Sequence, residues 1–566
     1  MNKYKYYAFI SYKREDESWA KWLQEKMEYY RLPTANEING EEYIRPIFRD
    51  ITDLRPGILS ERIKDALDNS KYLIAICSPL YSKSPWCDAE IKRFIETGKT
   101  KQIIPFIIDG TPYSKDTECF PPSLRELRGT NNELLAADIR PISREFAFVQ
   151  IVATMLDISV DSLWKRYLRK EEEEKRRIKE QNDHLLKLQS RITSEKAREL
   201  LDKYPYNESK AARIVLEVLP HNIDYPERPW VPEGEYVLRR ASKNRQSTIE
   251  INDKGGIICY SEKYCVCQGK RGPIDTNNKL YHDFSIRLYN DKGLNIFDIN
   301  YNTHVIDASI SSDNKYLALA TYESIILIDI DKKKEILNVK CNSNTSKILK
   351  ISNDNSKIVC ASGETLVILN IASGIKTERT IHDKKIVSLN FCFDNNHLIT
   401  TSLDKSTKIL DINTMNCDLC INHDAMAMYS TISNINNTIL TALDKKEDRI
   451  IIKEHSITTG REMSCLTMRG TFTTNMHFCE NLGILIIEDL SNIYLVDYKS
   501  GIIIDEFYDS RLLQFNDNKK EMSLIKNGIK IERYLLLSQK DLLDIATKTF
   551  GSYPLTEEDK RMYYIL

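Results

Sequence analysis

The second half of the chain repeats itself with a period of about 41 residues, and this repeat constrains the fold more than any other feature. Each unit contains a polar loop, a pair of apolar strand segments and a strand that ends in a polar residue. About four short strands in a unit of this length are typical of a β-propeller blade. We therefore predict an all-β propeller of about seven blades over residues 246–536. The equivalent strand ends are Tyr289, Asp329, Asn370, Asp411, Ser456 and Asp497.

The predicted last blade combines residues 510–536 with an N-terminal strand at 247–253. Pairing between these two segments would close the ring and remove exposed sheet edges. The repeats resemble degenerate WD repeats: the five Trp residues all precede the β region, which therefore contains no Trp-Asp dipeptide. A pair of β-sandwiches is the alternative, and the regular period disfavours it.

Composition excludes several classes of function. Lys and Arg number 81 and Asp and Glu 82, for a net charge of -1, whereas a general nucleic-acid binder would be strongly basic. No apolar run reaches the length of about 18 residues that a membrane helix needs, and the N-terminus does not read as a signal peptide. The 13 Cys show no paired spacing, which indicates reduced thiols. We therefore expect a cytoplasmic protein that binds neither nucleic acid nor membrane.

Residues 1–158 have a different pattern, in which apolar runs alternate with helical segments. This alternation predicts a parallel, doubly wound α/β sheet of the flavodoxin-like class. Ligands of such sheets bind beyond the carboxyl ends of the strands. The predicted strands are 5–11, 43–48, 72–78, 101–108 and 134–139, and the predicted helices are 16–30, 58–70, one that begins after Ser84 and Pro85, and 143–157.

Helical segments lie on both sides of the predicted propeller. Residues 159–245 read as a connector, with a charged run at 171–181 and apolar positions at helical spacing after it. Two interpretations stay open for this connector: a spacer, or a lever or self-association helix that couples the two ends. Residues 537–566 predict two short C-terminal helices, the second capped by Thr556, that pack on the connector or the propeller.

Several familiar kinds of catalytic or metal site are excluded. The first domain contains no His, since the nine His are at residue 184 and later, so a His-dependent triad or His-ligated metal site is impossible there. Gly98-Lys99-Thr100 follows a helix instead of opening one, and the upstream glycine of a P-loop is missing. Cys417 and Cys420 form one isolated pair without a second pair at zinc spacing, so we expect no metal site.

A carboxylate in the segment 78–91 remains as a candidate. Trp86 and Glu90 are separated by four residues and therefore share one face of the predicted helix. That helix begins just after an apolar strand, at the edge of the sheet where ligands bind. By spacing alone, a solvated Glu beside a half-buried Trp is the default interpretation.

Three motifs in order resemble those of a Toll/interleukin-receptor (TIR) domain, closest to bacterial ones, over about residues 4–158. FISYKRED (9–16) resembles the first box of the family, and FRDITDLRPG (48–57) resembles the second. SPLYSKSPWCDAEI (78–91) resembles the segment in which Trp-Cys precedes a glutamate. Several TIR domains cleave NAD, and in those this glutamate is catalytic. The resemblance therefore implies that Glu90 is the catalytic residue.

The resemblance also implies where the substrate would bind. Trp86 would stack on the nicotinamide or ribose, with core packing as an equal alternative. Phe9 and Ile10 would line the strand end near the base. Lys13 and Arg14 would pair with the pyrophosphate, with a solvated cationic loop as the alternative, and Asp50 belongs to the second-box loop that gates the pocket. Lys13 stands where the family often has Arg, which loses bidentate geometry.

The expected reaction suits a domain without His. The nicotinamide of NAD leaves as a neutral base and needs no general acid, and one carboxylate can stabilise the oxocarbenium-like ribosyl cation. The expected products are nicotinamide and ADP-ribose or its cyclic form, with NAD as substrate and no tightly held cofactor. We expect TIR self-association, triggered by a protein or small ligand on the propeller, as in antiphage abortive-infection effectors. A non-enzymatic signalling scaffold, or a transferase with another acceptor, stays open.

Overall fold

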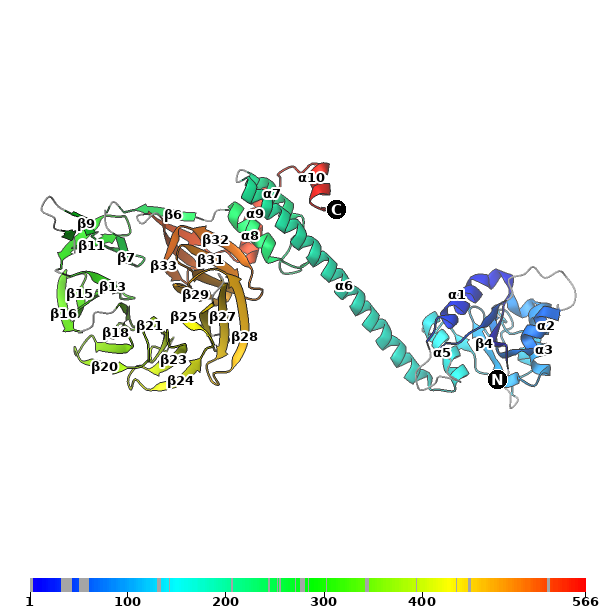
Figure 1. The fold of residues 1–566 in the computed structure, drawn as a ribbon. Helices are drawn as coiled ribbons and strands as arrows, with labels where there is room; N and C mark the ends of the chain where they lie inside the picture. Colours follow the sequence, from blue (N-terminus) through cyan, green and yellow to red (C-terminus); the bar gives the residue numbers. More distant parts are fainter. Residues whose placement is uncertain are drawn as a thin grey trace. The chain divides into compact units, whose positions relative to one another are not determined.

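The computed structural model shows two compact units, residues 1–181 and residues 182–566, which are described separately (Figure 1). The structure describes residues 4–31, 43–49, 61–129, 134–141, 143–204, 207–242, 245–251, 253, 256–269, 271–274, 280–282, 285–301, 303–341, 346–392, 394–433, 435–445, 449–526 and 530–565.

The first unit is built on a five-stranded parallel sheet with the strand order β2-β1-β3-β4-β5, as the alternating pattern predicts. The observed strands lie within one to three residues of most predicted ends. The fifth is much shorter than the predicted segment 134–139, because only two of its residues pair with β4. The strands are β1 (Tyr6–Ser11), β2 (Ile47–Arg49), β3 (Ser70–Cys77), β4 (Ile103–Ile107) and β5 (Ala137–Asp138).

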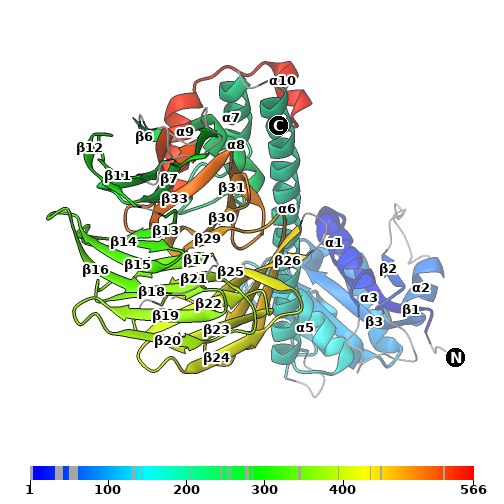
Figure 2. The same cartoon turned by 60° about the vertical axis from the view of Figure 1, so that its left-hand side comes forward.

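Helices cover both faces of this sheet because the strand side chains alternate between two apolar cores. Ile74 and Ile76 of β3 pack in the core that contains α1 and α5, whereas Leu73, Ala75 and Cys77 pack in the core that contains α2, α3 and α4. Figure 2 shows the helices around this sheet. They are α1 (Glu17–Glu28), α2 (Glu61–Asp68), α3 (Pro85–Glu96), α4 (Pro122–Arg125) and α5 (Arg144–Leu156).

The predicted connector is helical. Its main element is α6 (Val160–Lys203), a helix of 44 residues that contains the boundary between the two units. Two further helices follow, α7 (Glu208–Leu216) and α8 (Pro232–Ser242). The last of these begins at Pro232, and proline fits the first turn of a helix.

The C-terminal helical segment packs against the helices of the connector. One apolar cluster contains residues of α9 (Gln539–Phe550), the end of α6, α7 and α8, together with Tyr563 and Ile565, which follow α10 (Glu557–Met562). Thr556 caps α10 in a reciprocal capping box with Asp559, as the sequence predicts. The second unit therefore consists of a helical part joined to a β region.

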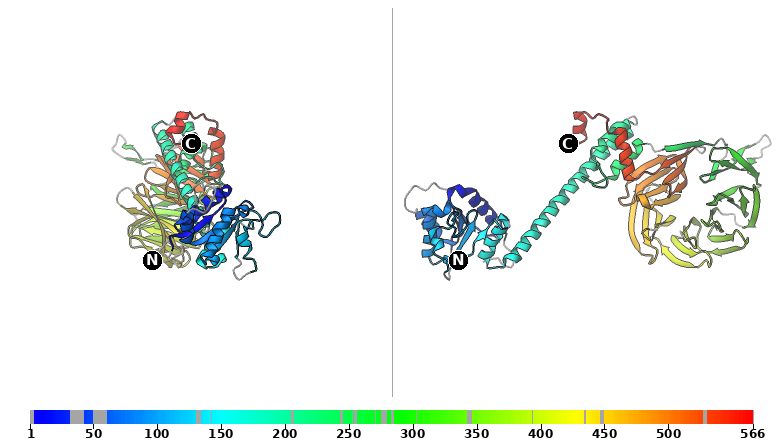
Figure 3. Two further views of the ribbon diagram at one scale, coloured as in Figure 1. Left: turned by 90° about the vertical axis from the view of Figure 1, so that its right-hand side faces the viewer. Right: turned by 180° about the vertical axis from the view of Figure 1, so that it is seen from behind.

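The β region is a seven-bladed propeller in the part of the chain that the structure describes (Figure 3). Each blade is a four-stranded antiparallel sheet, and the last blade adds β6 to β35, where Ile249 lies opposite Ile531. This pairing closes the ring with an N-terminal strand, as the sequence predicts. The strands of the first blade are β7 (Gly256–Tyr260), β8 (Tyr264–Gln268), β11 (Ser285–Asn290) and β12 (Asn295–Asn300), with the inserted hairpin β9 (Arg271–Ile274) and β10 (Leu280–His282).

The remaining six blades follow the 41-residue repeat. Their strands are β13 (Val305–Ile310), β14 (Tyr316–Thr321), β15 (Ser324–Asp329) and β16 (Lys334–Lys340); β17 (Lys347–Ile351), β18 (Lys357–Ser362), β19 (Thr365–Asn370) and β20 (Lys376–Thr380); β21 (Ile386–Phe391), β22 (His397–Ser402), β23 (Ser406–Asp411) and β24 (Cys417–Asn422); β25 (Met426–Ser433), β26 (Thr438–Lys445), β27 (Arg449–Ser456) and β28 (Glu462–Arg469); β29 (Asn475–Cys479), β30 (Ile484–Glu488), β31 (Asn492–Asp497) and β32 (Ile503–Tyr508); and β33 (Ser510–Asn516), β34 (Glu521–Lys526), β35 (Lys530–Leu535) and β6 (Arg245–Glu250).

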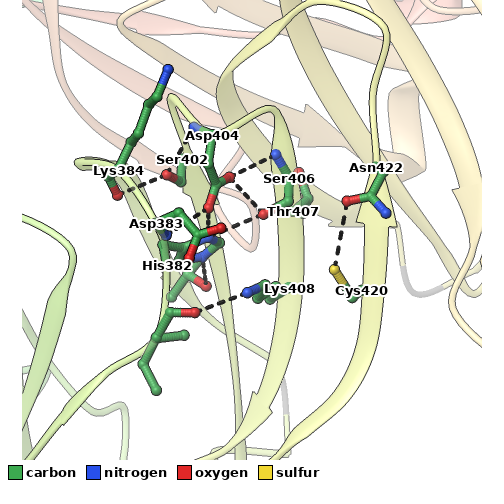
Figure 4. A network of polar contacts seen from close by, with 12 residues as sticks. His382, Asp383, Lys384, Ser402, Asp404, Ser406, Thr407, Lys408, Cys420 and Asn422 are labelled. Carbon is green, nitrogen blue, oxygen red and sulfur yellow. Dashed lines mark hydrogen bonds and ion pairs between the residues drawn. The ribbon is translucent and has the colours of Figure 1, made fainter.

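A polar network holds the fourth blade together (Figure 4). The ring of His382 is buried between the Asp404 carboxylate, 2.9 Å from its Nδ1, and the Thr400 hydroxyl, 2.9 Å from its Nε2. Ser406 donates to the other carboxylate oxygen of Asp404 at 2.6 Å. Burial lowers the pKa of His382, so the neutral ring donates from Nδ1 and accepts at Nε2.

Candidate active site in the first unit

The first unit brings the carboxyl end of β1 against the second turn of α3. Ser84 caps α3, with its hydroxyl accepting the backbone N–H of Cys87 at 3.4 Å, and Pro85 occupies the first helical position. These two residues fix where the helix begins and therefore which way Glu90 projects. The Glu90 side chain is buried, and its residue is 7% exposed.

Glu90 accepts a short hydrogen bond from a serine that comes from a different element. The Ser11 hydroxyl at the end of β1 donates to Oε2 of Glu90 at 2.5 Å. The hydroxyl of Tyr81 lies 2.7 Å from the Ser11 oxygen, and because the Ser11 proton goes to Glu90, Tyr81 is the donor in that contact. Tyr81 and Ser11 therefore form a chain of two donors that ends on the accepting carboxylate of Glu90.

The two neighbours of this carboxylate are held in their protonated forms. Burial raises the pKa of the Tyr81 hydroxyl well above its usual value, so Tyr81 remains a donor. Burial and the nearby charge of Glu90 raise the pKa of the Cys87 thiol to about 12. Cys87 is therefore a thiol at neutral pH and does not serve as a nucleophile.

Charged groups also gather beyond the ends of β1 and β3. Lys13 is half-buried directly after β1, where its charge acts on the Cys87 thiol, and Arg14 is exposed. The carboxylate of Asp16 accepts a hydrogen bond of 2.7 Å from Ser78, the residue after β3. Burial raises the pKa of Asp16. The end of this sheet where the β1 and β3 strands finish thus carries both signs of charge.

The other residues proposed from the sequence are placed differently. Trp86 is half-buried one turn before Glu90 on α3. Phe9 and Ile10 are each 1% exposed and pack in the two cores on opposite faces of the sheet, where Phe9 stacks on Phe48 at 5.2 Å. Their position makes them core residues in this structure and does not test the predicted contact with a base. Asp50 lies outside the described residues.

Two members of the Glu90 network were not predicted from the sequence. Ser11 and Tyr81 lie 79 and 9 positions from Glu90 in the chain, so no local spacing connects them. A usable signal existed for Ser11, because it is the last residue of an apolar strand whose carboxyl end faces the ligand-binding edge. Tyr81 gave no such signal.

The described part of the chain offers neither a cluster of metal ligands nor a membrane-spanning helix. Those residues contain no group of three or more His, Cys, Asp or Glu side chains arranged to hold a metal ion. They also contain no helix that is both long enough and apolar enough to cross a membrane.

Comparison with known families identifies the domain that carries this site. Residues 8–141 match the family model of the TIR domain. The chain therefore contains a TIR domain at these residues, followed by a helical segment and a seven-bladed β-propeller. A comparison with curated proteins finds no match.

Proposed function

We propose that the protein is an NAD+ glycohydrolase whose catalytic residue is Glu90. The observation that carries this proposal is the carboxylate of a TIR domain, oriented by the Ser11 hydroxyl at the end of the sheet where ligands of parallel α/β folds bind. Cleavage yields nicotinamide and ADP-ribose, or cyclic ADP-ribose when a group of the substrate itself captures the cation.

The reaction requires little more than one oriented carboxylate. The bond between the ribose C1′ and the nicotinamide nitrogen breaks, and its electron pair leaves with the nicotinamide as a neutral base. Positive charge develops on the ribose and is stabilised by Glu90, as carboxylates do in glycosidases. Water then forms the new bond to C1′ and loses its proton to solvent. Cys87 takes no part, because its thiol stays protonated.

The substrate-binding roles follow the resemblance. Lys13 and Arg14 pair with the pyrophosphate, and Trp86 packs against the nicotinamide or ribose. Asp50 belongs to the loop that gates the pocket, and Phe9 and Ile10 support the strand end from within the core. Glu90 is 7% exposed in the single chain, so this proposal requires the site to open when TIR domains associate. A trigger recognised by the propeller would control that association, and an antiphage role in the cytoplasm fits this arrangement.

A non-enzymatic scaffold is the second candidate. The burial of Glu90 and its hydrogen bond to Ser11 favour it, because a buried carboxylate with a partner is also a structural device. In this case the TIR domain would serve assembly alone, and the propeller would dock a partner protein.

Product analysis separates the two candidates. The full-length chain is incubated with NAD+ over a range of protein concentrations, and nicotinamide, ADP-ribose and cyclic ADP-ribose are separated by chromatography. The glycohydrolase releases nicotinamide at a rate per chain that rises with protein concentration. Absence of nicotinamide at every concentration, in a chain that still self-associates by light scattering, would favour the scaffold.

A further inference from the structure

The second unit contains a cavity of about 790 Å³ between its helical part and the last two blades of the propeller. Its walls come from the end of α6, the start of α7, α8, and strands β6, β31, β32, β34 and β35. A volume of this size accommodates a ligand of the size of a metabolite or nucleotide. The lining is rich in charged and aromatic side chains, with charges of both signs.

The carboxylate of Asp505 in this cavity accepts fewer hydrogen bonds than the carboxylate of Asp307 in another blade. Oδ1 of Asp505 accepts the backbone N–H of Glu506 at 2.9 Å, and among the described residues its Oδ2 receives no hydrogen bond. Asp307 has the same local contact, with Ala308 at 2.9 Å, but its Oδ2 also accepts the backbone N–H of Leu349 at 2.7 Å. Asp505 therefore presents an acceptor to the cavity that the protein does not use.

Cationic side chains lie on the same cavity wall. The exposed Arg240 donates from Nη1 to the carbonyl of Glu506 at 3.0 Å. Arg245 and Lys526 share the single carboxylate of Glu532, at 3.0 and 3.1 Å. The lining as a whole carries four cations and four carboxylates. The site therefore offers separate positive and negative positions to a ligand that carries both an anionic group and a donor.

Aromatic rings complete the lining. Tyr508 is 54% exposed, and Tyr534 and Phe507 pack edge to face at 4.9 Å. Such rings provide flat surfaces for a planar group without the entropy cost of a flexible side chain. The cavity thus combines the unused acceptor of Asp505, cationic side chains and aromatic surface.

We propose that this cavity binds a small molecule with a planar ring, an N–H donor for Asp505 and an anionic group for Arg240 and its neighbours. Two sources share this chemistry: a nucleotide, through its base and phosphate, and an aromatic amino acid, through its ring, ammonium and carboxylate. The cavity size accommodates either one. In both, the ligand joins the helical part of the second unit to the propeller.

The position of the cavity suggests what such a ligand does. Leu201 and Asp202 of α6 line it, and Arg198, one turn earlier, stacks on Tyr236 at 3.9 Å. Helix α6 starts at Val160, directly after the TIR domain in sequence. On the proposed NAD+ glycohydrolase function, we therefore take this ligand to be the trigger that the propeller unit senses.

Titration calorimetry on the full-length chain tests the binding site. The probes are adenosine and guanosine 5′-monophosphates in one arm and L-tryptophan and L-tyrosine in the other. We expect heat of binding from at least one arm at probe concentrations up to about 1 mM. Asp505→Asn and Arg240→Gln should each weaken that binding roughly tenfold or more.

Matched controls keep the test interpretable. Arg379 is also exposed and also donates from Nη1 to a backbone carbonyl, that of Met415 at 3.2 Å, but it lies in another blade, so Arg379→Gln should bind as the unaltered chain does. Circular dichroism of each variant verifies that it is folded. Absence of binding in both arms, or unchanged binding by folded Asp505→Asn and Arg240→Gln chains, would overturn the proposal.

The experiment also separates this proposal from the enzymatic one. Binding heat does not depend on NAD cleavage, and Glu90→Gln lies in the other unit, so that variant should bind the probe unchanged. A chain that binds the probe but never cleaves NAD+ would contradict the glycohydrolase alone. A chain that cleaves NAD+ but binds neither class of probe would contradict the cavity proposal alone.

Discussion

At the scale of single residues, the candidate site depends on donors that hold one carboxylate in place. Ser11 donates to Glu90 and Tyr81 donates to Ser11, so the carboxylate has a defined direction inside the domain. Hydrogen bonds to charged groups are worth about 1.5–3 kcal/mol, which is enough to fix a side chain against thermal motion. Orientation, and not added reactivity, is therefore the contribution we assign to Ser11.

Removal of the serine hydroxyl should slow the reaction without weakening substrate binding. We predict that Ser11→Ala lowers kcat for nicotinamide release roughly tenfold and leaves KM nearly unchanged, because the lost bond orients Glu90 and does not touch the substrate. Ser11→Thr, which keeps the hydroxyl, should restore much of the rate. A rise in KM at constant kcat in Ser11→Ala would contradict the positioning role.

Asp505 provides a second prediction at this scale, on stability. Burial raises its pKa from 3.8 to about 6 against the opposing charges of Arg239 and Arg240 from α8, with Glu506 beside it and Tyr534 opposite. Because the folded state holds the proton more tightly than the unfolded chain, this group costs stability above about pH 6, and the cost disappears as the pH falls towards 4.

Asp505→Asn should therefore stabilise the second unit at pH 7, on the order of 2 kcal/mol, with no gain near pH 4. Urea denaturation at pH 7 and at pH 4, monitored by far-UV circular dichroism, measures the free energy of unfolding of both chains. An equal effect at the two pH values would show that the ionised carboxylate is not the source of the cost. A gain of stability when Asp505 is replaced is also expected if this carboxylate is kept for ligand binding and not for the fold.

At the scale of elements, the fourth blade depends on the buried network around His382. Asp404 accepts from His382 and Ser406, and these contacts lower its pKa to about 2 despite partial burial. A carboxylate with a lowered pKa stabilises the fold above its unfolded value of about 3.9, and this contribution is lost as the pH falls towards 2. The neutral, buried His382 must also take up a proton in acid, which adds to the loss.

Asp404→Asn should lower the stability of the second unit by about 2 kcal/mol at pH 7 and by much less at pH 2–3. Chemical denaturation as a function of pH gives the comparison. Asp394 on the same blade is exposed, so Asp394→Asn provides a control that changes charge without breaking the buried network. An Asp404→Asn chain as stable as the control would contradict this role for the network.

The sequence predicts elements of this chain better than it predicts their contacts. The 41-residue repeat identified the blades and even the closing strand β6, because the equivalent strand ends recur at fixed spacing. The hairpin of β9 and β10 was missed, since it interrupts the first blade and has no counterpart in the others. Ser11 meets Glu90 across 79 positions, and a contact of this separation has no periodic signal in one sequence.

At the scale of the whole molecule, the chain consists of two units with separate cores. Strand residues of the TIR domain pack with α1 to α5, whereas the helical part of the second unit has its own cluster that includes α9. Units without a shared core unfold independently. The long helix α6 is the chain segment that joins the two units in sequence.

Calorimetry should resolve two unfolding transitions in the full-length chain. Asp505→Asn should shift only the transition of the second unit, and a ligand bound in its cavity should raise that same transition, by the mass-action effect of binding to the folded state. A single transition that every variant shifts as a whole would contradict the two-unit description.

The central claim is that Glu90 performs the chemistry, and one comparison of rates tests it most directly. Glu90→Gln and Glu96→Gln change the same residue type on the same helix, but Glu96 is half-exposed and ends α3, so its loss leaves the site intact. We predict that nicotinamide release from NAD+ by the full-length chain falls at least about 100-fold in Glu90→Gln and changes less than about twofold in Glu96→Gln. Equal rates in the two folded variants would contradict the account.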